Sequence, residues 1–228
     1  MRAGCGEPIV LLHGYMSKKE SFYYQINCLK DYYTVIAPDF PAFGGSAPIE
    51  RAWSVGDYCD WLVKFFKAQN LESAHILAHS FGARVAIKFA AAHPERVNKL
   101  IITGGAGVVC HDEKYHKKVR AYRRMKRFFP RLAEKRYGSE EYKKLSPLMR
   151  ESYKKIVNED LREEAAKILS PTLLIYGKGD TSTPPEKEGR IFASQIKNSR
   201  LEVVAGSHFC FCEHPDYFNG LVINFLRN

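Results

Sequence analysis

Short apolar runs alternate with amphipathic segments along most of this 228-residue chain. Six of the runs are continuously apolar, which is typical of strands that are buried on both faces of a parallel sheet. The predicted strands cover residues 9–13, 33–38, 74–79, 100–103, 172–176 and 201–205. Helical patterns lie between them, so the sequence predicts an α/β fold: a doubly wound, mainly parallel sheet of about six strands with helices on both faces.

Three of the intervening helices have clear sequence signals. Ser54 is a typical N-cap with an acidic residue, Asp57, three positions later, and it predicts a helix that continues to about residue 70. A second helix is expected from residue 81 to about residue 92, where Pro94 prevents its continuation. A last helix is expected over residues 217–226.

Residues 107–168 have helical periodicity and no convincing strand. Apolar residues recur at helical spacing in two groups: Val119, Tyr122, Met125 and Phe129, and then Tyr142, Leu145, Met149, Tyr153 and Ile156. Pro130, Gly138 and Pro147 are expected to interrupt the helices. We predict a helical cap over residues 107–168, inserted between a first part of the α/β core (1–106) and a second part (169–228).

The net charge of +10 is concentrated in this predicted cap. Residues 107–168 contain 18 Lys+Arg and 10 Asp+Glu, against 17 and 15 in the rest of the chain. The basic run over residues 116–127 raises the possibility of nucleic acid or an anionic membrane surface, but no recognised nucleic-acid-binding module accompanies it. We interpret it as a solvated cap face, with a cationic rim that attracts an acidic substrate as the alternative.

The cysteines and the hydropathy pattern suggest a cytoplasmic protein. The six cysteines are scattered and form no CxxC pair, which favours reduced thiols over a disulfide framework or a zinc site. No apolar run reaches the roughly 18 residues of a membrane span, and no signal-peptide pattern opens the chain. We therefore expect neither secretion nor stable membrane insertion.

A predicted strand and a predicted helix meet at Ala78-His79-Ser80-Phe81-Gly82, in a small-x-Ser-x-small pattern. A serine on such a sharp turn projects its hydroxyl above the carboxyl edge of the sheet, and the small residues let neighbouring backbone approach. Asp180 and His208 each follow a later predicted strand. A carboxylate in that place can hold an imidazole in one tautomer, so the order Ser, Asp, His points to nucleophilic acyl transfer.

The loop after the first predicted strand, His13-Gly14-Tyr15, is a candidate for the oxyanion hole. The backbone amides of Tyr15 and Phe81 can donate two hydrogen bonds to a tetrahedral oxyanion. We interpret His13 as a brace for this turn and His79 as a residue that packs beside the elbow. We expect Asp39 to satisfy backbone donors of the loop that follows it, with a reserve role as the acid partner of the histidine.

These motifs resemble the α/β-hydrolase superfamily over nearly the whole chain. The matching stretches are Ile9-Val10-Leu11-Leu12-His13-Gly14, residues 37–46, and the Ser80, Asp180 and His208 segments. The resemblance implies Ser80 as nucleophile, His208 as general base and then acid, and Asp180 as its orienting partner. Ala78 replaces the usual glycine of the elbow. Only eight residues precede Ile9, where the family usually has two further strands, so we expect an exposed sheet edge and, through it, a homo-oligomer.

The resulting functional expectation is a cytoplasmic serine hydrolase that cleaves small or medium acyl esters as a carboxylesterase, through an acyl-enzyme and without a metal or organic cofactor. The expected partner is a small-molecule ester, with an anionic ester left open; no nucleic acid is expected. Two alternatives remain open. One is a carbon–carbon bond hydrolase of ring-cleavage-type diketone acids, which the cap also resembles, and the other is a non-catalytic ligand-binding member of the fold.

Overall fold

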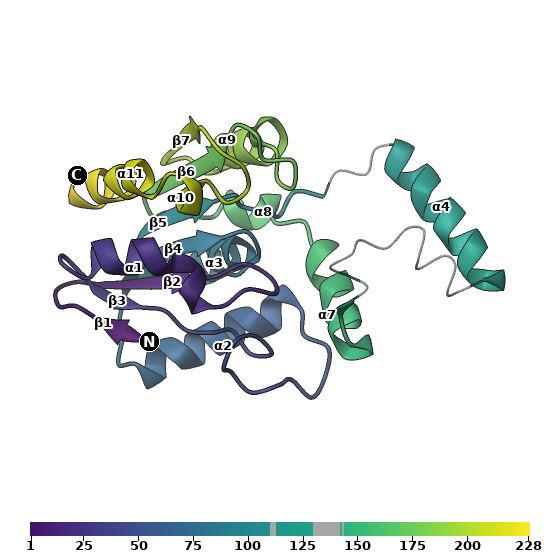
Figure 1. The fold of residues 1–228 in the computed structure, drawn as a ribbon, viewed down its shortest axis with the longest axis horizontal. Coiled ribbons are helices and arrows are strands. Elements are labelled where there is room, and N and C mark those ends of the chain that lie inside the picture. Colours follow the sequence, from purple (N-terminus) through teal and green to yellow (C-terminus); the bar gives the residue numbers. More distant parts are fainter. Residues whose placement is uncertain (110–112, 130–141, 143) are drawn as a thin grey trace.

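The computed structural model describes residues 1–109, 113–129, 142 and 144–228, and Figure 1 shows its fold. Seven strands form one sheet in the order β1-β3-β2-β4-β5-β6-β7. The strands are β1 (Arg2–Ala3), β2 (Pro8–Leu12), β3 (Thr34–Ile36), β4 (Ala74–His79), β5 (Val97–Thr103), β6 (Thr172–Gly177) and β7 (Ser199–Val204). All neighbouring pairs are parallel except β1 and β3, which are antiparallel.

The six predicted strands correspond to β2–β7, and the predicted α/β fold class is confirmed. The two-residue strand β1 is a seventh strand that the sequence analysis did not predict. It is too short to carry a hydropathy pattern, and it exists because Arg2 and Ala3 pair with Ile36 and Val35 of β3. The edge of the sheet beyond β3 is therefore covered in part.

Helices lie on both faces of the sheet (Figure 1). The longer ones in the α/β core are α1 (Tyr23–Leu29), α2 (Val55–Ala68), α3 (Phe81–Ala92), α9 (Arg190–Gln195) and α11 (Pro215–Arg227). Shorter helical segments are η1 (Lys19–Phe22), η2 (Pro94–Arg96), η3 (Pro185–Gly189) and α10 (Cys210–Glu213). The sequence analysis did not predict α1, which spans seven residues.

Two apolar clusters hold the helices to the sheet, one on each face. Within β2, Val10 and Leu12 pack with residues of α2, α3 and α9, whereas Ile9 and Leu11 pack with residues of α1 and α11. This alternation follows from the two-residue period of a strand, which turns successive side chains to opposite faces. It explains why the predicted strands are apolar at nearly every position.

The start of α2 confirms the predicted helix cap. The Ser54 side chain accepts a hydrogen bond from the Asp57 amide, and the Asp57 carboxylate accepts one from the Ser54 amide. The two residues thus satisfy each other's free backbone donors at the first turn. The helix α3 has the predicted bounds, and α11 extends slightly beyond the prediction at both ends.

The described part of the predicted cap is helical: α4 (Glu113–Phe128), α7 (Pro147–Val157) and α8 (Arg162–Ala165). Pro147 begins α7 rather than interrupting a helix, because proline is well tolerated at the first helical position. Pro130 and Gly138 lie outside the described residues. Figure 1 shows α7 beside the α/β core and α4 farther away from it. The boundaries of the cap remain a prediction.

Hydrogen bonds attach α7 to the core. The Trp53 amide donates to the Ser152 hydroxyl at 2.8 Å, and the Lys155 ammonium donates to the Ala52 carbonyl at 2.9 Å. On α4, the described basic side chains of the predicted solvated face are exposed: Lys117, Arg120, Arg124 and Arg127.

Five cysteines lie in the described part of the chain, and all five have free thiols, whereas Cys110 lies outside it. No helix in the described ranges is both long enough and apolar enough to cross a bilayer. The cellular location of the protein stays a prediction.

Candidate active site

Ser80 lies on a sharp turn between β4 and α3. Its backbone has φ 52° and ψ −109°, a combination that is strained for any residue except glycine. Its amide donates a hydrogen bond to the Thr103 carbonyl on β5 at 3.1 Å. Two residues later, a Cβ atom on Gly82 would lie 2.2 Å from the Leu12 carbonyl oxygen, so only glycine fits. This turn has the strand–turn–helix geometry that the sequence predicts for a nucleophile elbow.

Asp180 and His208 form a hydrogen-bonded pair after β6 and β7. Nδ1 of His208 donates to Oδ2 of Asp180 at 2.7 Å. Asp180 is only 3% exposed, and its carboxylate also accepts hydrogen bonds from the amides of Ser182 and Thr183 and from the Thr183 hydroxyl, each at 2.8 Å. Burial by itself would raise the pKa of Asp180, but the bonds from His208 and Thr183 lower it below its ordinary value.

This pairing decides the chemistry available at the imidazole. Because Nδ1 of His208 carries the donated proton, Nε2 of the neutral ring has a free lone pair that can accept a proton. The ionised carboxylate of Asp180 would stabilise the resulting cation.

Ser80 and His208 line the same cavity, which has a volume of about 710 Å³. The residues lining it are Gly14, Tyr15, Met16, Ser17, His79, Ser80, Phe81, Arg84, Ala106, Tyr153, Ile156, Val157, Ser182, Thr183, Glu188, His208 and Phe209. The structure thus brings Ser80, Asp180 and His208 to the carboxyl edge of the sheet. In the described part of the chain, Ser80 Oγ forms no hydrogen bond with His208; catalytic hydrogen bonds of unliganded enzymes often tighten only when substrate binds.

The predicted oxyanion donors, Tyr15 and Phe81, both line this cavity. Neither of their amides donates a hydrogen bond to an acceptor among the described residues, so both are available to a ligand. The loop that carries Tyr15 lies close to the elbow, because a Cβ atom on Gly14 would be 3.6 Å from Cβ of Ser80. The Tyr15 hydroxyl donates to the Met149 carbonyl of α7 at 3.1 Å, which connects this loop to the cap.

His13 braces the loop, as predicted. Its Nδ1 donates to the Gly14 carbonyl at 2.8 Å, and its Nε2 accepts from the Phe40 amide at 3.0 Å. Burial lowers the pKa of His13, which favours the neutral ring that these two bonds require. With both nitrogens engaged, His13 has no free atom to offer a substrate.

Asp39 also has the predicted structural role. Its carboxylate accepts hydrogen bonds from the Gly45 amide at 2.9 Å, from the Lys19 amide at 2.7 Å and from the Lys19 ammonium at 2.6 Å. Burial alone would raise its pKa, but these bonds lower the pKa of Asp39 to about 2. The residue that pairs with His208 is Asp180, so Asp39 is not needed as a reserve acid.

His79 packs beside the elbow, as predicted, and it also contacts His208. Its Nε2 donates to the His208 carbonyl at 3.0 Å, and the centroids of the two rings are 4.7 Å apart. Burial, followed by the nearby His208, lowers the pKa of His79 to about 3.

Three further cavity residues were not singled out in the sequence analysis. Thr183 holds Asp180, and its position three residues after that aspartate is a typical turn pattern that could have indicated it. Arg84 lies one helical turn after Ser80, and its Nη1 donates to the carbonyls of Ile156 and Glu159, each at 2.9 Å. Glu188 accepts the Val108 amide at 2.9 Å, and burial raises its pKa.

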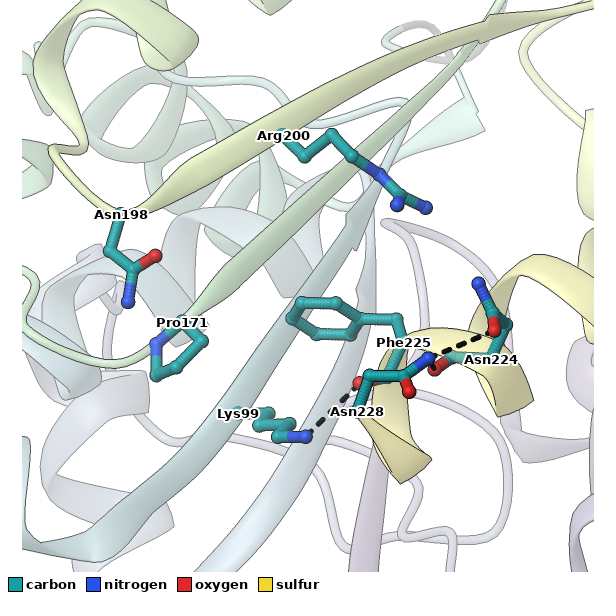
Figure 2. Close-up of a pocket in the computed structure, with 7 residues that line it drawn as sticks. All are labelled: Lys99, Pro171, Asn198, Arg200, Asn224, Phe225 and Asn228. Carbon is teal, nitrogen blue, oxygen red and sulfur yellow. Dashed lines mark hydrogen bonds between the residues drawn. The ribbon is translucent and has the colours of Figure 1, made fainter.

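A second cavity, of about 290 Å³, lies at the amino ends of β5, β6 and β7, and Figure 2 shows the residues that line it. It is lined by Lys99, Pro171, Asn198, Arg200, Asn224, Phe225 and Asn228. The Lys99 ammonium donates to the carbonyls of Phe225 and Leu226 at the end of α11, and the Asn228 amide bonds to Asn224. Parallel α/β sheets bind ligands at the carboxyl ends of their strands, and this pocket lies at the amino ends. Among the described residues, no cluster of His, Cys, Asp and Glu is arranged to hold a metal ion.

Comparison with known proteins agrees with this architecture. Residues 7–116 match a family described as the alpha/beta hydrolase fold. The whole chain superimposes on an esterase from Exiguobacterium antarcticum, with 24% identity, a TM-score of 0.80 and 94% of that chain covered. It also superimposes on the meta-cleavage product hydrolase from Pseudomonas fluorescens IP01, with 24% identity, a TM-score of 0.77 and 93% of that chain covered.

Among curated sequences, a 1-acylglycerol-3-phosphate O-acyltransferase of Arabidopsis thaliana is 36% identical to this chain over 108 residues. The match covers 43% of the chain. The match spans only 25% of that longer relative. The strained serine turn at the carboxyl edge of a mainly parallel sheet defines an α/β-hydrolase type of fold. The chain has the α/β-hydrolase fold.

Proposed function

We propose that this protein is a serine hydrolase that cleaves small or medium carboxylic esters. The observation that carries the proposal is the 2.7 Å hydrogen bond between buried Asp180 and His208, because His208 lines the same cavity as Ser80 on its strained turn. The similarity to an esterase and to a meta-cleavage product hydrolase supports hydrolysis as the reaction class. The similarity to an acyltransferase supports transfer of an acyl group as the first step.

In the proposed reaction, Ser80 Oγ attacks the ester carbonyl carbon while Nε2 of His208 takes the hydroxyl proton. Asp180 stabilises the imidazolium, and the amides of Tyr15 and Phe81 donate to the oxyanion. The carbon–oxygen bond of the leaving alcohol then breaks, and the alcohol departs with the proton from His208. Water repeats the sequence on the acyl-enzyme, releases the carboxylic acid and regenerates the Ser80 hydroxyl.

The size and lining of the cavity support the substrate class. A volume of about 710 Å³ falls within the range of small-molecule sites, which is roughly 300–1,000 Å³. On the cap side, Tyr153, Ile156 and Val157 of α7 contribute aromatic and aliphatic surface suited to an acyl chain.

A second candidate is hydrolysis of a carbon–carbon bond in a diketone acid. The buried guanidinium of Arg84 on the cavity wall favours it, because such a substrate carries a carboxylate. Glu188 lines the same cavity and offsets part of this positive charge. We therefore place ester hydrolysis first.

The test is hydrolysis of p-nitrophenyl esters from acetate to octanoate by the wild type and by Ser80→Ala. We expect Ser80→Ala to lower kcat by at least about 10⁴-fold, because the covalent route is lost. Ser17→Ala is the matched control, since Ser17 also lines the cavity but has no place in the proposed chemistry. Its kcat should stay within about threefold of the wild type.

Other outcomes separate the alternatives. Turnover of a chromophoric dienoate but of no ester would establish the carbon–carbon hydrolase. A folded wild type that turns over neither substrate, and whose Ser80 does not react with a fluorophosphonate, would point to a ligand-binding member of the fold.

A further inference from the structure

His79 occupies the point where three parts of the site meet. It is the last residue of β4, directly before Ser80, and it is 3% exposed. On one side, its Nε2 donates a hydrogen bond to the backbone carbonyl of His208 at 3.0 Å. On the other side, Nδ1 faces the loop of Tyr15, because a Cβ atom on Gly14 would lie 2.9 Å from it. One side chain therefore lies against both the loop of the general base and the loop that carries Tyr15, one of the two predicted oxyanion donors.

The ring of His79 also packs against the ring of His208, with centroids 4.7 Å apart. It is enclosed by aromatic neighbours, with Phe209 at 5.4 Å and Phe211 at 4.7 Å between centroids. His208 is thus held in two ways. Asp180 fixes the direction of the ring through Nδ1, whereas His79 contacts both the ring face and the main chain that carries it.

The hydrogen bond decides the protonation of His79. Because its partner is a carbonyl oxygen, Nε2 must carry the proton, and Nδ1 of the neutral ring carries none. The ionisable groups around His79 are His208, Asp180 and His13, and burial strongly disfavours a charge on it. His79 therefore stays neutral when His208 becomes a cation, and it adds no repulsion to that state.

We propose that His79 is a positioning residue for the hydrolysis proposed above: its hydrogen bond to the His208 carbonyl and its ring contact keep the imidazole of His208 aligned with Ser80. The expected kinetic effect rests on the proposed function. The restraint on His208 rests only on contacts among the described residues. In this role His79 exchanges no proton with the substrate. Its effect comes from holding the main chain of the base, where small displacements of a reacting group are costly.

A matched pair of variants isolates the hydrogen bond. His79→Gln and His79→Met have side chains of similar length, but only glutamine supplies an N–H donor for the His208 carbonyl. The control is His75→Met, because His75 lies on the same strand, is 4% exposed and bonds to Glu7 rather than to the site. It measures the effect of removing a buried imidazole from β4.

We expect His79→Met to lower both kcat and the rate of Ser80 labelling by a fluorophosphonate by roughly 10–100-fold, with KM within about twofold. His79→Gln should recover at least about a third of the wild-type kcat, and His75→Met should leave kcat and labelling unchanged. The inference is overturned if His79→Met affects kcat no more than His75→Met does, or if glutamine is no better than methionine.

Amide hydrogen exchange gives a readout that does not depend on the substrate. Exchange at residues 206–210 should be faster in His79→Met than in the wild type, because methionine has no donor for the His208 carbonyl. In His79→Gln, which keeps a donor, exchange should be close to that of the wild type. If the wild type has no hydrolase activity but the two variants differ in exchange as expected, the proposed function fails and the structural restraint on His208 stands. If the exchange rates are equal in the two variants, the restraint itself is wrong.

Discussion

One cavity lies at the carboxyl ends of the parallel strands (the carboxyl edge of the sheet) and the other at their amino ends (the amino edge), and the two use polar side chains in different ways. At the carboxyl edge, His208 is held at Nδ1 by Asp180, and its Nε2 is left for a ligand. At the amino edge, the Lys99 ammonium donates to two carbonyls at the end of α11. A polar side chain in a pocket therefore indicates function when the protein orients it and leaves one of its polar atoms free for a ligand.

Backbone strain is also concentrated at the carboxyl edge. Four non-glycine residues in the described part of the chain have positive φ: Met16, Ala42, Asn70 and Ser80. Met16, Ala42 and Ser80 lie in segments that follow β2, β3 and β4, at the carboxyl edge. Strained backbone persists where its surroundings determine it, and such places are often functional. The following predictions test this contrast between a site that is prepared for a ligand and a pocket whose groups stabilise the fold.

The largest expected effect is on activity at the carboxyl edge. Asp180→Asn should lower kcat by about 10³–10⁴-fold, because an amide neither stabilises the His208 cation nor enforces its tautomer. The measurement is the steady-state rate on the ester that the wild type hydrolyses best. Asp39→Asn is the comparison at the same edge, and an equal loss of activity in that variant would contradict the assignment of Asp180 as the acid partner.

The next effect is on stability against pH, through Asp39. Its pKa of about 2 lies below the ordinary value of 3.8, so its ionised form stabilises the fold above about pH 4, and this stabilisation is lost as the pH falls toward 2. We expect Asp39→Asn to lower the free energy of unfolding at pH 7 by about 2 kcal/mol. Urea unfolding of both proteins at pH 7 and near pH 2.5 measures this gap. A gap that does not narrow at the lower pH would contradict the prediction.

At the amino edge, Lys99→Met should reduce stability and leave the chemistry intact. We expect a loss of about 1 kcal/mol, because the last carbonyls of α11 lose a charged donor at the negative end of the helix dipole. Urea unfolding gives the stability, and ester hydrolysis gives the activity. A fall in kcat of more than about threefold in the folded variant would mean that the two edges are coupled.

The smallest effect is expected for Arg200→Ala in the same pocket. Arg200 pairs with Glu202 at 3.1 Å, but its side chain is half exposed, and such ion pairs contribute little. The free energy of unfolding should change by less than about 0.5 kcal/mol, and kcat should not change. A larger change in either the free energy of unfolding or kcat would show that Arg200 has a role beyond a weak surface ion pair.

Much of the fold could be predicted because its signals are local. Strands buried on both faces are apolar at nearly every position, and Ser54 with Asp57 marks the start of α2 within four residues of sequence. The strand β1 and the short helix α1 could not be predicted in this way. A two-residue strand has no periodicity to detect, and β1 depends on the partner it finds in β3.

The sequence by itself determined the order of Ser80, Asp180 and His208 and the place of each after a strand, because the carboxyl ends of parallel strands meet at one edge. It also determined the strained turn at Ser80, since small neighbours are a local requirement. Only the tertiary structure decided that His79 holds the main chain of His208 and that Arg84 binds the carbonyl of Glu159. These contacts join residues 129 and 75 positions apart, and no local pattern specifies which distant group a buried donor will meet.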